Sequence, residues 1–151
     1  MVRFLSPLFL AMLLSFSAAH ADSTSDTVAK FGLIGEWAVD CKADPGPNLR
    51  GRLKYTIGKE GDIVHIRNFG DRTVTDYVKS ARITSEGWLE LRVLFPELEK
   101  DARDRTFALA KQPDGTIRAM YSRATNGGER TIQDGKFTSN SKETPRQTKC
   151  D

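Results

Sequence analysis

The sequence has few of the residues from which catalytic and metal sites are most often built. It contains two cysteines, Cys41 and Cys150, and two histidines, His20 and His65. It has no Cys-x-x-Cys pair and no glycine-rich phosphate loop. The sequence also lacks a large excess of positive or negative charge. It has 23 Lys and Arg and 20 Asp and Glu, for a net charge of +3. Such a balance is not the electrostatic footprint of a nucleic-acid-binding protein.

The position of His65 weakens the case for catalysis further. His65 alternates with Ile63 and Arg67, whereas Val64 and Ile66 form the apolar side of the same segment. We therefore expect His65 on the outer face of a strand. This placement leaves no Ser-His-Asp, Cys-His or multi-histidine arrangement. We expect a non-enzymatic protein with no catalytic residues, no metal and no cofactor.

The first 21 residues are typical of a cleavable export signal. Arg3 precedes an apolar run over residues 4–19, and Ala19-His20-Ala21 supplies the small-x-small cleavage pattern. The predicted cut follows Ala21, and the next residue is Asp22 rather than a cysteine that could carry a lipid. We expect a periplasmic or secreted protein that does not insert into the membrane after signal cleavage.

Helical periodicity is nearly absent after the signal. Short alternating segments recur instead, separated by Gly, Pro, Asn or Asp, which is typical of β-strands joined by turns. The expected strands span residues 33–41, 50–57, 62–68, 73–83, 88–95, 105–111, 116–123 and 129–137. Eight strands in hairpin order predict an all-β, antiparallel up-and-down barrel, which leaves no unpaired edge. A β-sandwich is the alternative.

The cysteines suggest how the barrel is tied together. In an oxidising compartment an even pair predicts a disulfide between Cys41 and Cys150. The alternative is two free thiols, which would be available to bind a metal. The expected organisation is a signal peptide (1–21), a flexible leader (22–31), a barrel domain (32–137) and an irregular tail (138–151). The disulfide would tie this tail back to the first strand.

The segment Gly35-Glu36-Trp37, at the head of the first strand, resembles the Gly-x-Trp motif of the calycin superfamily. That superfamily includes lipocalins, avidins and bacterial metalloprotease inhibitors. The resemblance implies that Trp37 closes one barrel end and is covered by a cation from the last strand. By position that cation is Arg130, with Arg123 and Lys136 as alternatives.

Three aromatic residues are the candidate ligand contacts. Trp88 follows a glycine turn and begins a strand, so it either caps the core or lies at the barrel mouth. Tyr55 and Tyr121 fall on apolar faces, where they either complete the core or present hydroxyls to a ligand.

Two functions follow as expectations. The first is a lipocalin-like periplasmic protein that binds a small apolar or amphipathic molecule, for which we expect a hollow barrel. The second is a protein-binding barrel, such as an inhibitor of a secreted or periplasmic protease, for which we expect a solid one. In the second case the segment 22–27 would be an extended strand presented to the target, as the resemblance to the metalloprotease inhibitors implies.

Overall fold

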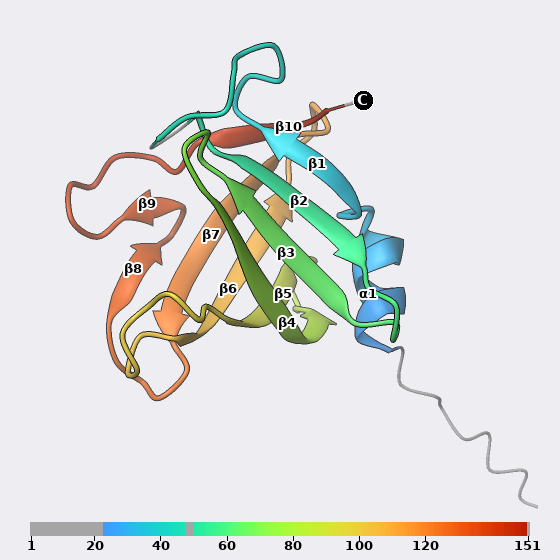
Figure 1. Ribbon diagram of the computed structural model, residues 1–151. Helices are drawn as coiled ribbons and strands as arrows, with labels where there is room; N and C mark the ends of the chain where they lie inside the picture. The colour runs from blue at the N-terminus through green and yellow to red at the C-terminus, as the bar shows by residue number, and fades with distance from the viewer. Residues whose placement is uncertain (1–22, 48–49, 151) are drawn as a thin grey trace, which may run out of the picture.

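The protein is an eight-stranded antiparallel β-barrel with one helix beside it (Figure 1). The computed structural model describes residues 23–47 and 50–150, so the expected signal peptide lies outside the described residues. The elements within those ranges are α1 (Thr24–Phe31), β1 (Gly35–Ala38), β2 (Arg52–Ile57), β3 (Ile63–Asn68), β4 (Thr73–Ile83), β5 (Leu89–Leu94), β6 (Asp104–Lys111), β7 (Ile117–Ala124), β8 (Arg130–Gln133), β9 (Lys136–Phe137) and β10 (Arg146–Cys150). The predicted all-β class and closed barrel are confirmed, and the sandwich alternative is wrong.

The strand that closes the barrel is β10, not the expected segment 129–137. Strands β1 to β7 pair in sequence order, and β10 then pairs with both β1 and β7. Trp37 of β1 lies opposite Lys149, and Ile117 of β7 lies opposite Gln147. The expected irregular tail therefore supplies the last barrel strand. Its five residues contain no aliphatic or aromatic side chain, so alternation could not reveal it.

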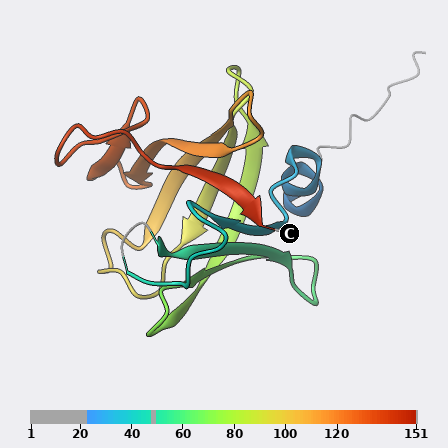
Figure 2. The same cartoon turned by 90° about the horizontal axis from the view of Figure 1, so that it is seen from above.

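The segment 129–137 forms a small hairpin outside the barrel instead of one strand. Asp134 and Gly135 both adopt positive φ values, 51° and 70°, which suit the tight turn between β8 and β9. Ser122 of β7 lies opposite Ile132 of β8, so the hairpin continues the sheet from β7. In both views it projects on the side of the barrel away from α1 (Figures 1 and 2).

The expected flexible leader contains α1. Ser23 caps the helix by accepting a 3.1 Å hydrogen bond from the backbone N–H of Asp26, and Gly32 ends it in the left-handed conformation. Val28 and Phe31 are buried on one face, and the helix packs against β4. Only two apolar residues of this short segment anchor it, which explains why its periodicity was too weak to predict a helix.

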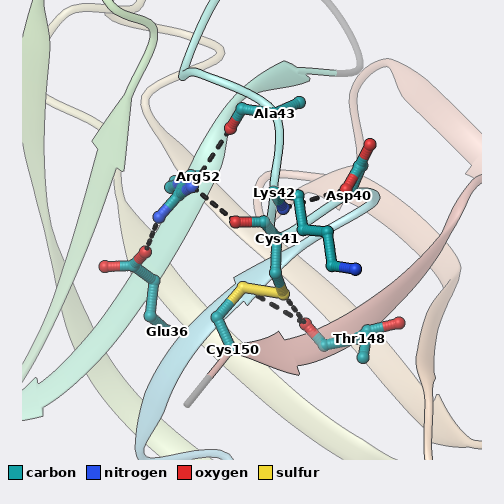
Figure 3. The surroundings of a disulfide bond; sticks show 8 residues. All are labelled: Glu36, Asp40, Cys41, Lys42, Ala43, Arg52, Thr148 and Cys150. Carbon is teal, nitrogen blue, oxygen red and sulfur yellow. Dashed lines mark hydrogen bonds and ion pairs between the residues drawn. A yellow bond between two sulfur atoms is a disulfide. The ribbon is translucent and has the colours of Figure 1, made fainter.

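The predicted disulfide between Cys41 and Cys150 is present (Figure 3). It joins the loop after β1 to the end of β10 across 109 positions of sequence. Arg52 holds the same loop, since its guanidinium donates to the carbonyls of Cys41 and Ala43 at 2.7 and 3.0 Å and to Glu36 at 2.7 Å. The seam between the first and last strands is thus fastened covalently and by charged hydrogen bonds.

Buried apolar side chains form one core cluster that begins at α1 and continues through the barrel. They come from the helix, from the segment after it and from most barrel strands: Val28, Phe31, Leu33, Trp37, Tyr55, Ile63, Val78, Leu89, Leu91, Val93, Phe95, Leu109 and Ile117. We call the end of the barrel near α1 the helix end and the opposite end the open end. Within the described ranges, no helix combines the length and the apolar character that crossing a bilayer requires.

Candidate functional site

A row of polar side chains crosses the inside of the barrel on three neighbouring strands. Tyr55 of β2 lies opposite His65 of β3, which in turn lies opposite Asp76 of β4. All three residues are buried, with Asp76 fully inaccessible. Because side chains on neighbouring strands at one register position point to the same face, the register itself brings this row together.

The expectation that His65 faces outward is wrong. The inward side of β3 carries Ile63, His65 and Arg67, and His65 is only 4% exposed. Its ring stacks on that of Tyr55, with centroids 4.4 Å apart and planes 3° from parallel. The Tyr55 ring therefore fixes the orientation of the imidazole.

Asp76 and Arg67 form an ion pair beside His65. Nε of Arg67 donates to Oδ2 of Asp76 at 2.6 Å, and Nη2 donates to Oδ1 at 3.1 Å. The guanidinium also lies 5.1 Å from the ring centroid of Phe95, at the open end. Both carboxylate oxygens thus accept from one cation, the arrangement that makes burial of a charge tolerable.

Burial sets the protonation of this row. Together with a smaller effect of the nearby positive charge of Arg67, it lowers the pKa of His65 to about 3, so the imidazole is neutral near pH 7. Burial, with a smaller contribution from the charge of Asp76, raises the pKa of the Tyr55 hydroxyl above its usual range. Burial also raises the pKa of Asp76, although its hydrogen bonds to Arg67 act in the opposite direction.

Neither ring nitrogen of His65 has a hydrogen-bond partner within the part of the chain that the structure describes. Nδ1 lies 3.4 Å from Oδ2 of Asp76, a contact too long for a good hydrogen bond. A buried polar group without a partner costs about 1–3 kcal/mol of stability. Buried polar groups are nearly always paired, so this imidazole is an exception within the described residues.

Tyr55 and His65 of this row border a pocket of about 240 Å³ that lies inside the barrel at the open end and opens to solvent. Its walls come from barrel strands, from the β8–β9 hairpin and from the segment before β10: Leu53, Tyr55, His65, Arg67, Phe95, Phe107, Leu109, Ala119, Ser122, Ile132, Phe137, Thr144, Pro145 and Gln147. Most of these side chains are apolar. We refer to it below as the interior cavity.

Residues of the β8–β9 hairpin reach the wall of the interior cavity because β7 pairs with β10 along only part of its length. β7 pairs with β10 only through Ile117 and Arg118 at its beginning, and farther along it pairs with β8. Ile132 and Thr144 therefore lie where a continuous β7–β10 ladder would otherwise close the barrel. Thr144 is held there by hydrogen bonds from its hydroxyl to the carbonyls of Ala119 and Gly135, at 2.7 and 3.2 Å.

Of the three aromatic residues chosen from the sequence, only Tyr55 borders the interior cavity. Trp88 and Tyr121 border an open groove of about 440 Å³, together with Glu90, whose side chain alternates with the inward Leu89 and Leu91 of β5. The groove therefore lies on the outer face of the barrel.

Sequence reasoning missed His65, Arg67 and Asp76 as site residues. A signal for Asp76 was present, because it alternates in step with its inward neighbours Val74 and Val78 on β4.

The cation over Trp37 is Lys149 of β10, whereas Arg130 lies on β8 beside the outer groove. Nζ of Lys149 is 5.8 Å from the indole centroid, and the indole N–H donates to the carbonyl of Leu33 at 2.7 Å. Gly35 makes this approach feasible. Its φ is +129°, and a Cβ there would lie 2.7 Å from Cε of Lys149. Lys149 rather than Arg130 covers Trp37, because the covering cation comes from the strand that pairs with β1, and that strand is β10.

Among the described residues, no three His, Cys, Asp or Glu side chains are grouped so that they could hold a metal ion. Comparisons of the chain with models of protein families, with curated proteins and with solved structures find no match. The barrel fold itself is compatible with a binding protein. What the protein binds therefore has to be argued from the interior cavity and its row of polar residues.

Proposed function

We propose that the protein is a non-enzymatic, calycin-type binding protein that takes a small, partly apolar molecule into the interior cavity. One observation carries the proposal: an apolar cavity whose wall contains a neutral, buried imidazole without a partner. Ligand sites combine such an apolar lining with a few well-placed polar groups that orient the ligand.

The volume of the cavity gives a scale for the part of the ligand that it holds. An engineered cavity of about 150 Å³ in another protein binds benzene, and drug-sized sites begin near 300 Å³. At about 240 Å³, the interior cavity suits a molecule of one ring or a short branched chain. The exported compartment proposed from residues 1–21 agrees with a disulfide that persists under oxidising conditions.

A protease inhibitor that uses an extended N-terminal segment has less support. Most of the segment proposed for that part belongs to α1, which begins at Thr24 and buries Thr27 and Val28. The hollow open end also favours the small-molecule function over a solid, protein-binding barrel. We therefore place protein binding second.

Native mass spectrometry of the protein purified from its own host tests this function. We expect a co-purifying mass of a few hundred daltons or less, lost when Ala119, which borders the cavity, is replaced by Leu. The matched control is Ala29→Leu on the exposed side of α1, which adds the same volume away from the cavity and keeps the bound mass. A tight complex with another protein, with no small bound mass in either form, would overturn the proposal.

A further inference from the structure

The β8–β9 hairpin forms part of the wall of the interior cavity but not part of the core. Ile132 and Phe137 line the cavity and are only partly buried. Within the described ranges, neither side chain belongs to the core cluster or packs against it, whereas Phe107 and Ala119, which line the cavity from β6 and β7, do pack against it. The apolar side of the hairpin therefore contacts the cavity rather than the core.

The ladder that joins the hairpin to the barrel is short. β8 pairs with β7 at two positions, with a shift of register between them, and β9 lies at the edge of the sheet. Gly135 is the only buried residue of the segment 129–138. Because burial of apolar surface is the main source of stability, a segment with so little of it belongs to the part of a structure that opens most easily.

Polar contacts centred on Gly135 hold the tip of the hairpin in place. The carbonyl oxygen of Gly135 accepts from Nη2 of Arg118 at 2.6 Å and from the backbone N–H of Thr144 at 2.9 Å. The N–H of Gly135 donates to the carbonyl of Met120 at 2.8 Å. We call Arg118, Gly135 and Thr144 the clasp. Water can replace every partner in these bonds, so breaking the clasp costs little compared with exposing apolar core.

A different cation fixes the start of β8. Nη2 of the buried Arg105 donates to Oγ1 of Thr131 at 2.9 Å and to the carbonyl of Glu129 at 3.3 Å. The hairpin is thus held at two places, by Arg105 where β8 begins and by the clasp at its tip. When the clasp breaks, the hairpin can swing about the start of β8 without pulling a side chain out of the core.

We propose that the β8–β9 hairpin is a flap of the interior cavity, which opens when the clasp breaks while the barrel stays folded, and which a molecule bound in the cavity holds closed. The second part rests on the small-molecule binding proposed above. A molecule in the cavity contacts Ile132 and Phe137 together with the barrel wall, and so supplies the apolar contact that the hairpin does not make with the core. Because opening removes this wall, binding favours the closed form.

Amide hydrogen exchange of the ligand-free protein, followed by NMR, tests whether the hairpin opens separately. The amides of Gly135 and Thr144 report on the clasp, and the amides of β5, which is paired on both sides, report on global unfolding. After correction for intrinsic rates, we expect the two clasp amides to share one opening equilibrium and to exchange at least tenfold faster than those of β5.

Two glycine variants separate opening of the flap from unfolding. Gly135→Ala places a Cβ 2.9 Å from Nη2 of Arg118, so the guanidinium has to leave the clasp, whereas Gly115→Ala strains a similar positive φ at the β6–β7 turn with no atom within 4 Å of the new Cβ. We expect Gly135→Ala to speed exchange of the clasp amides roughly tenfold. Gly115→Ala speeds exchange in β5 and leaves the clasp amides at the wild-type rate. Clasp amides that follow β5 in Gly115→Ala, or that do not respond to Gly135→Ala, would overturn the flap.

Toluene tests whether a bound molecule closes the flap. At ten times its dissociation constant, a ligand that binds only the closed, folded form slows exchange about elevenfold. We expect this slowing at the clasp amides as well as in β5. Slower exchange in β5 with unchanged clasp amides would overturn the coupling and leave small-molecule binding intact. If toluene shifts no resonance of a residue lining the cavity, the coupling and the proposed function both fail, while the ligand-free measurements still decide whether the flap opens.

Discussion

Acid is expected to destabilise this barrel through His65. The unfolded chain takes up a proton on histidine near pH 6.5, whereas burial holds the pKa of the folded His65 at about 3. Between these values the unfolded state binds more protons than the native state, so stability falls as the pH falls. The loss is about 1.4 kcal/mol per pH unit, and about 2 kcal/mol between pH 7 and pH 5.

The groups that face His65 decide how this loss can be isolated. Tyr55 does not titrate in the acid range, because burial raises the pKa of its hydroxyl. Asp76 acts in the opposite direction, because a carboxyl with a raised pKa binds its proton more readily in the native state and so favours folding as the pH falls. A comparison with His65→Phe removes this contribution, since both proteins contain Asp76.

The assay is urea denaturation of wild type and His65→Phe at pH 7, 6 and 5, with the free energy of unfolding extrapolated to water. We expect the wild type to lose about 2 kcal/mol more than the variant over this range. The difference in slope is the readout, because it does not depend on the packing cost of the substitution itself. Parallel pH profiles would refute the assignment of a buried neutral imidazole.

Three further outcomes follow from particular contacts. Asp76→Asn leaves a cation beside the cavity without its partner and costs about 2–4 kcal/mol of stability in urea denaturation, whereas Asp104→Asn, in an exposed pair, costs less than about 1 kcal/mol; equal costs would contradict this. Gly70→Ala and Gly61→Ala both strain a positive φ, at a cost of about 1 kcal/mol, but only at Gly70 would the new Cβ meet a backbone oxygen, 2.4 Å away. The melting temperature of Gly70→Ala is therefore the lower of the two, and the reverse order would contradict the stated clash. Replacing Cys150 by Ser opens a loop of 109 positions and lowers the free energy of unfolding by up to about 4–5 kcal/mol, an effect that reducing agent reproduces in the wild type but not in the variant.

Turn residues and period-2 alternation were enough to predict the barrel. Strand β4 matches its expected range of 73–83. The signal is strong because a glycine or a Pro-Asp-Gly turn separates strands whose apolar residues alternate. The disulfide could also be predicted, since the chain offers only one pair of cysteines.

The phase of β3 could not be predicted from that segment alone. Apolar residues occur on both of its sides, with Ile63 inside and Val64 and Ile66 outside. β-Branched residues suit either face of a strand, so their side does not identify the interior. The pairing with β4 decides which side of β3 faces the interior. The buried residues of β4 alternate clearly, and the register places His65 opposite the buried Asp76, so His65 also faces inward. The candidate site was missed because it depends on this pairing between strands.

The closing strand also escaped prediction for a physical reason. Arg146, Gln147, Thr148 and Lys149 are all polar, and none gives a hydrophobic alternation. Their strand conformation comes from ladders with β1 and β7 on either side. The last strand can be polar because its neighbours and the disulfide hold it in place.

The position of β10 has a consequence for the order in which the chain folds. Strands β1 to β7 can pair with their sequence neighbours as soon as each hairpin exists, because those contacts are local. The seam between β1 and β7 cannot close until the residues of β10 have been synthesised, because β10 pairs with both strands and supplies the partner of Cys41. Until then both seam strands expose unpaired edges, which are templates for association with other chains. A nascent chain is therefore most vulnerable to aggregation just before β10 arrives, and the covalent bond that forms afterwards makes the closure permanent.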